Sequence, residues 1–322
     1  MVMSEIFLIY LHFFGKKGEK VKEVIINKND AGQRLDKFLK KYMPKLPSGM
    51  LYKGIRKNTV RINGKHAKNA DVFLVEGDVL KLYFNDEFFS KRNNIKKAPY
   101  PEICYEDDNI LILNKPCGIP VHGDDKGTEL TLVSEVLYYL YEKGEYNPDE
   151  EKSFSPALCN RLDRNTSGLV IAAKNAKALR FINEKIKKRE IKKYYICIIE
   201  GKLKERSGTF YARLERSDKK VTINENNSGK EIVTGYEVLD ENDNFSLVQV
   251  ELITGRTHQI RAHFAHLGHP LRGDTKYGAK KDKRFKYQAL SSFLLRFDFL
   301  GDNGEFEYLN GMEFKIKPPF SL

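Results

Sequence analysis

Residues 159–174 hold the most informative stretch of the chain, CNRLDRNTSGLVIAAK. Asp163 stands between Arg161 and Arg164, and the small residues at 166–168 lead into an apolar run that predicts a buried strand. A neighbouring arginine keeps an aspartate ionised, which a nucleophile or a general base requires. A structural Asp–Arg pair that supports a loop would show the same pattern, so this stretch by itself leaves both interpretations open.

The chain around this stretch predicts more strands than helices. Strands are expected at 109–114, 169–173, 194–199, 233–239, 246–253 and 294–299, several of them with alternating β-branched or aromatic residues. Helices are expected at 130–141, 176–188 and 259–267. Because these helices do not alternate strictly with the strands, we predict an α+β fold with a mainly antiparallel, mixed sheet rather than a doubly wound one.

The N-terminal part of the chain combines a compact α/β pattern with a strong positive charge. The expected elements are a strand at 24–26, a helix at 34–42, a second helix capped by Ser48, and strands at 60–65 and 79–84. Residues 34–68 contain eleven Lys or Arg and one acidic residue, whereas a merely solvated face normally intersperses acids. We therefore expect a basic face that contacts RNA phosphates. The predicted contacts are Arg34, Lys37, Arg56, Lys57 and Arg61.

We expect four segments along the chain. Residues 1–22 form a leader whose role the sequence does not reveal, 23–88 a small α/β domain, 89–100 a polar and basic linker, and 101–322 a larger domain. The apolar run at 6–14 is far shorter than the ~20 residues that a membrane span needs, so no membrane association is predicted.

Composition narrows the class of protein. The 322 residues, 41% of them hydrophobic, are enough for two compact domains. A net charge of +12 and a pI near 9.2 favour a polyanionic partner. The four cysteines include no CxxC pair and are expected to be reduced thiols in a cytoplasmic protein. A monomer is expected.

Several segments resemble, in the same order, the sequence blocks of the RluA-type pseudouridine synthases. The central block is RLDRNTSG at 161–168. The others are residues 107–122, Lys193-Tyr194-Tyr195 followed by Gly201, residues 254–263, and residues 267–278. In addition, residues 24–86 resemble the S4 RNA-binding domain.

This resemblance implies conversion of uridine to pseudouridine in RNA, and it implies the site residues. Asp163 would be catalytic, either as a nucleophile or as a base. Tyr195 would stack on the target base and take part in removing the C5 proton. Arg261 would form the salt bridge that orients Asp163, with Arg256 as the alternative. Arg161 would fill the space left by a flipped-out nucleotide, or bind phosphate.

No cofactor and no metal site is predicted. His258, His263, His266 and His269 lie close together in the sequence, but the interleaved arginines would repel a cation. The turn at 115–118 is too short for a nucleotide-binding phosphate loop. Lys115 in this turn is predicted to bind the substrate RNA.

Two departures from the family pattern bear on the choice of substrate. Asn160 stands where many relatives carry His, and Ser291-Ser292 replaces a frequent His-Ala pair. Neither position is expected to take part in bond breaking.

Large-subunit ribosomal RNA is the expected substrate, because RluA-type enzymes with an S4 domain are mostly ribosomal. Transfer RNA is the alternative substrate. A different class, an RNA-binding or ribosome-assembly protein with an idle core, would be indicated by a replaced Asp163 or a broken block at 254–263, and both are intact. A metal-dependent nuclease is the least favoured reading.

Overall fold

The computed structural model describes residues 21–89, 95–123, 130–216, 221–224 and 228–322. These residues form two compact units. The first comprises the described residues up to Lys97 together with 140–156 and 175–177, and the second comprises 98–139, 157–174 and 178–322. Two short segments of the expected domain at 101–322 therefore belong to the N-terminal unit. Most of the expected leader and part of the linker, residues 1–20 and 90–94, lie outside the described residues.

Polar contacts hold residues 140–156 within the N-terminal unit. The buried Asp30 carboxylate accepts hydrogen bonds from the backbone N–H and the hydroxyl of Ser153, at 2.9 and 2.6 Å. Glu151 accepts one from Asn29 at 2.6 Å. These partners are more than 120 residues apart in sequence, which is why no local pattern predicted the pairing.

In its described residues the N-terminal unit is a small antiparallel sheet with two α-helices and one short 3-10 helix. Its strands, in the spatial order β1-β4-β2-β3, are β1 (Lys22–Ile25), β4 (Val79–Leu82), β2 (Val60–Ile62) and β3 (Lys65–His66). Its helices are α2 (Leu35–Tyr42), α3 (Ser48–Arg56) and the short η1 (Asp86–Phe88). Leu35, Phe38 and Leu39 face the core at helical spacing. Ser48 is the first helical residue and Pro47 occupies the N-cap position, so the predicted cap is wrong by one residue.

The larger unit is built on one mixed sheet, which confirms the predicted α+β class. Its strand order is β11-β10-β12-β13-β9-β14-β8-β6-β5, with β7 and β15 paired at the side, and only the β14–β8 pair is parallel among the described strands. The strands are β5 (Ile103–Glu106), β6 (Ile110–Lys115), β7 (Ala157–Leu158), β8 (Ser167–Ala173), β9 (Ile191–Glu200), β10 (Ser207–Arg216), β11 (Val221–Ile223), β12 (Lys230–Glu241), β13 (Phe245–Leu252), β14 (Leu290–Phe297) and β15 (Glu313–Lys315). The helices are α4 (Leu132–Glu142), α5 (Ala176–Lys187), α6 (Gln259–His266), η2 (Thr275–Tyr277) and η3 (Gly304–Leu309). All six predicted strands and three predicted helices of this unit are present, whereas β5, β7, β10, β11 and β15 were not predicted.

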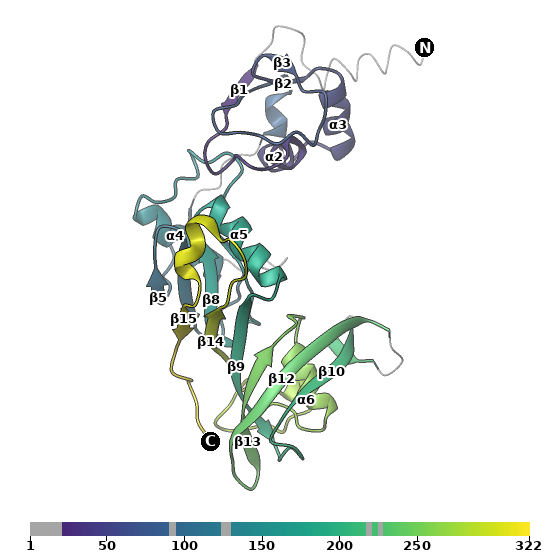
Figure 1. Cartoon of the computed structure of the whole chain (residues 1–322), viewed down its shortest axis with the longest axis vertical. Helices are drawn as coiled ribbons and strands as arrows, with labels where there is room; N and C mark the ends of the chain where they lie inside the picture. The colour runs from purple at the N-terminus through teal and green to yellow at the C-terminus, as the bar shows by residue number, and fades with distance from the viewer. Residues whose placement is uncertain (1–20, 90–94, 124–129, 217–220, 225–227) are drawn as a thin grey trace. The chain divides into compact units, whose positions relative to one another are not determined.

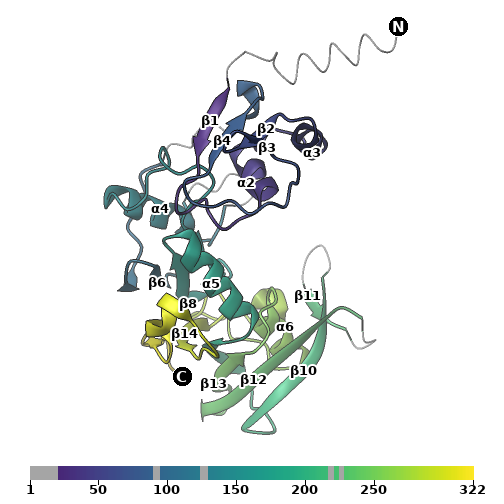
Figure 2. The same cartoon turned by 45° about the horizontal axis from the view of Figure 1, so that its top comes forward.

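Helices cover the two halves of this sheet separately (Figures 1 and 2). Ile182 of α5 packs in one cluster with Ile112 of β6 and Ile171 of β8. Ala262 of α6 packs in another, with Leu214 of β10. The middle strands β9, β14 and β8 link the halves, and the loop that carries Asp163 leads directly into β8.

A close backbone approach fixes the start of β8. Gly168 has φ +112°, and a Cβ at this position would lie 2.1 Å from the carbonyl oxygen of Ser292 on β14. Only glycine fits there. The small residues after Asp163 thus let the parallel β8–β14 pair form, which anchors one end of the loop.

Candidate active site

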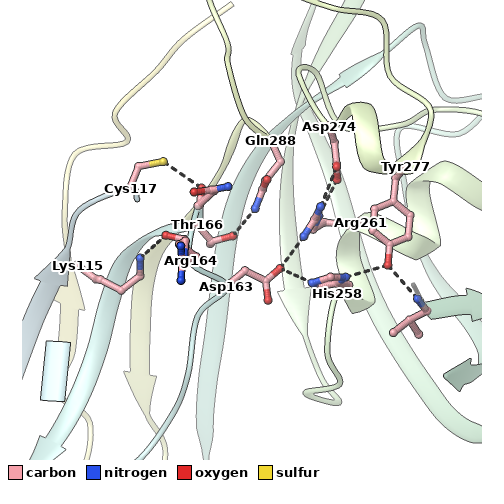
Figure 3. Close-up of polar contacts among 12 residues, drawn as sticks. Lys115, Cys117, Asp163, Arg164, Thr166, His258, Arg261, Asp274, Tyr277 and Gln288 are labelled. Atoms are coloured by element: carbon pink, nitrogen blue, oxygen red, sulfur yellow. Dashed lines mark hydrogen bonds and ion pairs between the residues drawn. The ribbon is translucent and has the colours of Figure 1, made fainter. Parts of the chain in front are cut away.

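A bridging arginine holds the Asp163 carboxylate (Figure 3). Nη1 of Arg261, on α6, donates to Oδ2 of Asp163 at 3.0 Å. The other side of the guanidinium donates to the buried Asp274, from Nε at 2.6 Å and from Nη2 at 2.8 Å. The predicted ion pair between Arg261 and Asp163 is therefore present. Asp274 fixes the arginine in place, because two parallel hydrogen bonds define its orientation.

The turn at 115–118 forms hydrogen bonds with the backbone of the loop that carries Asp163. The Lys115 ammonium donates to the carbonyl oxygen of Arg164 at 2.9 Å, and the backbone N–H of Gly118 donates to the same oxygen at 3.0 Å. The Cys117 thiol donates to the carbonyl oxygen of Asn165 at 3.3 Å. The loop carbonyls next to Asp163 are thus tied to rigid structure, which limits the freedom of the aspartate.

A cavity of about 270 Å³ opens in front of the carboxylate, a size that suits one nucleobase. Asp163, Tyr195 and Lys193 line it together with the predicted Arg161 and Arg256. Tyr195 and Lys193 come from one face of β9, as strand alternation requires. Burial raises the pKa of the Tyr195 hydroxyl, so this group is protonated at neutral pH. Burial also lowers the pKa of the Lys193 amine.

Comparison with known proteins identifies the family of this chain. The model of the RNA pseudouridylate synthase family matches residues 109–266. The ribosomal large subunit pseudouridine synthase C of Vibrio vulnificus is 34% identical over 273 residues, which cover 83% of this chain and 82% of that protein. The chain belongs to the RNA pseudouridylate synthase family.

Other relatives of the synthase agree in sequence and in fold. An uncharacterized RNA pseudouridine synthase of Aquifex aeolicus is 33% identical, with coverage of 81% of this chain and 82% of its own. The solved structure of human RNA pseudouridylate synthase domain containing 1 has a TM-score of 0.55 and 24% identity, and covers 72% of this chain and 88% of its own. The human protein therefore shares the fold of the synthase.

One predicted substrate contact of the synthase is wrong. Lys115 is fully buried, and its ammonium donates to three carbonyl oxygens, of Pro116, Ile119 and Arg164. Burial lowers the pKa of this amine to about 8. With its three N–H donors used inside the protein, Lys115 shapes the turn and the loop rather than contacting RNA.

The two basic candidates beside the cavity differ from Arg261 in exposure. Arg161 and Arg256 are exposed at its rim. The backbone N–H of Arg256 donates to the Gln259 side chain at 3.1 Å, and it is Arg261 that reaches the carboxylate. Arg256 is therefore not the hydrogen-bond partner of Asp163, and RNA contact by the two exposed arginines stays a prediction.

The site also includes His258, Asp274 and Tyr277, for which no catalytic role was predicted. His258 Nε2 lies 3.6 Å from Oδ2 of Asp163. The signal was present, because all three lie in the family blocks at 254–263 and 267–278. No contact between His258 and Asp163 was predicted.

The other histidines of this region have separate partners. His263 Nδ1 contacts the Thr234 hydroxyl at 2.9 Å, and His269 Nδ1 contacts the Glu200 carbonyl oxygen at 2.9 Å. Within the described residues, no group of three or more His, Cys, Asp or Glu side chains could hold a metal ion.

The positions that depart from the family pattern are structural. The Asn160 side chain accepts a hydrogen bond from the Ile171 N–H at 2.8 Å and donates to the Leu169 carbonyl at 3.4 Å, so it ties the loop to β8. Ser291 and Ser292 are buried on β14. Ser292 lies opposite Tyr195 of β9, and Asn160 also lines the cavity.

The N-terminal cations predicted to contact RNA do not all line one groove. Arg34 and Arg56 line a shallow groove with Tyr52 and Lys68. The Arg34 guanidinium donates to Asp36 from two nitrogens, at 3.1 and 3.0 Å. Lys37 and Lys57 are exposed, and Arg61 lies over the ring of Tyr83.

Among the described helices, none has the length and apolar character needed to cross a membrane.

Proposed function

We propose that the protein isomerises specific uridines to pseudouridines in large-subunit ribosomal RNA, with Asp163 as the catalytic residue. The observation that carries this proposal is the Asp163 carboxylate, held by Arg261 at the mouth of a base-sized cavity that Tyr195 also lines. The names of the curated relatives, ribosomal large subunit pseudouridine synthase C, support ribosomal RNA as the substrate.

The reaction needs few groups because nothing is oxidised or reduced. The bond between N1 of uracil and C1′ of the ribose breaks, the base rotates, and C5 bonds to C1′. The proton on C5 leaves, and N1 gains one, so that the product is an isomer. Whether Asp163 attacks as a nucleophile or removes a ribose proton, it must be ionised, and its carboxylate forms an ion pair with Arg261 at 3.0 Å.

Pseudouridine mapping tests the substrate. Total RNA is mapped from cells that carry the gene, cells that lack it, and cells complemented with the Asp163→Asn variant. We expect one or more positions of large-subunit ribosomal RNA to lose pseudouridine in the last two strains. Loss of pseudouridine only in transfer RNA would show that transfer RNA, and not ribosomal RNA, is the substrate. No loss at any position would contradict the proposal.

We propose that the Tyr195 ring stacks on the target base and that its hydroxyl takes part in the reaction. Tyr195→Phe keeps the ring against the base, so we expect a lower kcat with unchanged RNA affinity. Tyr195→Ala removes the stacking surface as well, and base–aromatic stacking contributes about 1–3 kcal/mol to binding. We therefore expect the Ala variant to lose affinity in addition, measured by single-turnover kinetics across enzyme concentration. A Phe variant with wild-type kcat would remove the hydroxyl from the mechanism.

The N-terminal unit is proposed to act as an S4-like RNA-binding module. Arg56 and Lys68 line its groove, and neutralising both with Gln should weaken RNA binding and reduce the slope of log affinity against log salt by up to about two. Saturated single-turnover conversion should be unchanged. The matched control is Lys41→Gln with Lys45→Gln, two exposed lysines of the same unit that do not line the groove. Equal effects of the two pairs would indicate a general charge effect and no RNA groove.

The proposal places the reaction in the cytoplasm and treats the protein as a monomer. All four cysteines are unpaired, as is usual in a reducing compartment.

A further inference from the structure

A chain of polar contacts ends at the Asp163 carboxylate (Figure 3). The backbone N–H of Val221 donates to the Tyr277 hydroxyl at 3.2 Å, and this hydroxyl lies 2.9 Å from Nδ1 of His258. On the other edge of the ring, Nε2 lies 3.6 Å from Oδ2 of Asp163. The chain therefore connects β11 to the carboxylate through η2 and the residue before α6.

The donors and acceptors along this chain are all satisfied in only one arrangement. An ionised carboxylate can only accept, so Nε2 of His258 must carry the ring proton to interact favourably with Asp163. In a neutral ring Nδ1 is then an acceptor, and the Tyr277 hydroxyl can donate to it while its oxygen accepts from Val221. Tyr277 thereby selects the tautomer of His258.

Burial keeps the ring in this neutral state. It lowers the pKa of His258, and the nearby cations act in the same direction while the nearby carboxylates oppose them. The charged groups that face the ring are Asp163, Asp274, Arg261 and Lys276. A protonated ring would carry a donor at both nitrogens, and the Tyr277 hydroxyl would then have to turn its own proton away from Nδ1.

Both contacts of the Asp163 carboxylate fall on the same oxygen. Arg261 and His258 approach Oδ2, at 3.0 and 3.6 Å, and among the described residues no side chain forms a hydrogen bond or ion pair with Oδ1. We propose that His258 is a positioning residue, which together with Arg261 holds Oδ2 so that Oδ1 is presented to the uridine, in the tautomer that Tyr277 selects. Contacts of this kind are often long in the free enzyme and shorten when substrate binds. The inference rests on the proposed function, because it concerns the role of Asp163 in that reaction.

The backbone of His258 suggests informative variants. Its φ of 55° and ψ of 20° are left-handed, a conformation that Asn also adopts readily. An Asn side chain ends at the position of Nδ1 and cannot reach Asp163, whereas a Gln side chain can place an N–H near the position of Nε2. Tyr277→Phe removes only the hydroxyl and keeps the ring, which packs against His258 and Arg261.

The test measures kcat, RNA affinity, melting temperature and the pH dependence of kcat for the full-length protein on one substrate RNA. Loss of a group that orients a catalytic one typically costs about 10–100-fold. We expect His258→Asn to lower kcat by about tenfold at pH 7 with unchanged affinity, and His258→Gln to remain within about threefold of wild type. Tyr277→Phe should lower kcat by less than His258→Asn. Protonation at Nδ1 ends the donation from Tyr277 that fixes the ring, so the part of the wild-type decline of kcat towards acid pH that this causes should be absent in His258→Gln, because Gln cannot be protonated there.

Two results would overturn the inference. A wild-type kcat in His258→Asn would show that the ring does not position the carboxylate. Equal loss in the Asn and Gln variants, with lowered melting temperatures and an unchanged pH profile, would assign His258 to packing alone. The Asp163→Asn variant distinguishes failure of this inference from failure of the proposed function. Turnover by Asp163→Asn would overturn the proposed function and the inference together. An inactive Asp163→Asn together with a fully active His258→Asn would overturn only the inference.

Discussion

Asp163→Asn is expected to abolish pseudouridine formation, by at least about a thousandfold in kcat, while RNA binding survives. Asn keeps the shape of the side chain and can still accept a hydrogen bond from Arg261, but it cannot act as a nucleophile or as a base. The variant should also fold normally. Arg261 is not left unpaired, because Asp274 still holds it by two hydrogen bonds.

The measurement is single-turnover conversion at saturating enzyme, together with RNA affinity and melting temperature. Asp243→Asn is the matched control, because it removes one carboxylate charge from an exposed turn between β12 and β13. We expect wild-type activity for this control. Retained turnover in Asp163→Asn would show that another group performs the chemistry.

The second large effect is expected for Arg261→Met, which should lower the free energy of unfolding by about 3–5 kcal/mol. The side chain of Asp274 is only 2% exposed, and both of its oxygens accept from Arg261. Removing the arginine therefore leaves a buried carboxylate without its partner, at a cost close to that of breaking a buried ion pair. Activity should be lost as well, because Asp163 loses its 3.0 Å contact.

The double variant Arg261→Met with Asp274→Asn separates charge from packing. Because it removes both buried charges, we expect it to recover part of the lost stability in urea denaturation but none of the activity. Arg261→Lys keeps the charge but cannot bridge two carboxylates, so it should lie between wild type and the Met variant in stability. If Arg261→Met were as stable as wild type, the contact between Arg261 and Asp274 would contribute nothing to the free energy of unfolding.

Local sequence patterns were enough for much of the fold. The runs at 169–173 and 194–199 predicted β8 and β9, because a buried strand needs consecutive apolar residues and this requirement is visible within one segment. Strands β10, β11 and β15 were not predicted, since their exposed faces carry polar and charged residues that hide the apolar pattern of a strand, although each pairs with a strand close by in the sequence. Residues 140–156 were expected in the larger domain, but they group with the N-terminal unit through contacts with Asn29 and Asp30 that no local pattern reveals.

The sequence by itself determined the candidate catalytic carboxylate and the basic character of the protein. Asp163 stands between arginines in a stretch that leads into a buried strand, and the family blocks place Arg261 on a helix after it. Motif order and net charge are properties of the chain as written, so they need no coordinates.

Only the tertiary structure decided which groups surround the carboxylate and in what role. His258 contacts Asp163 from a segment about 100 residues further along the chain, and Asp274 and Tyr277 act on it through Arg261 and His258. Lys115, expected to bind RNA, is buried and donates to three carbonyl oxygens. Whether a charged side chain faces solvent or the interior depends on how distant segments pack, because burial is settled by neighbours that are remote in sequence.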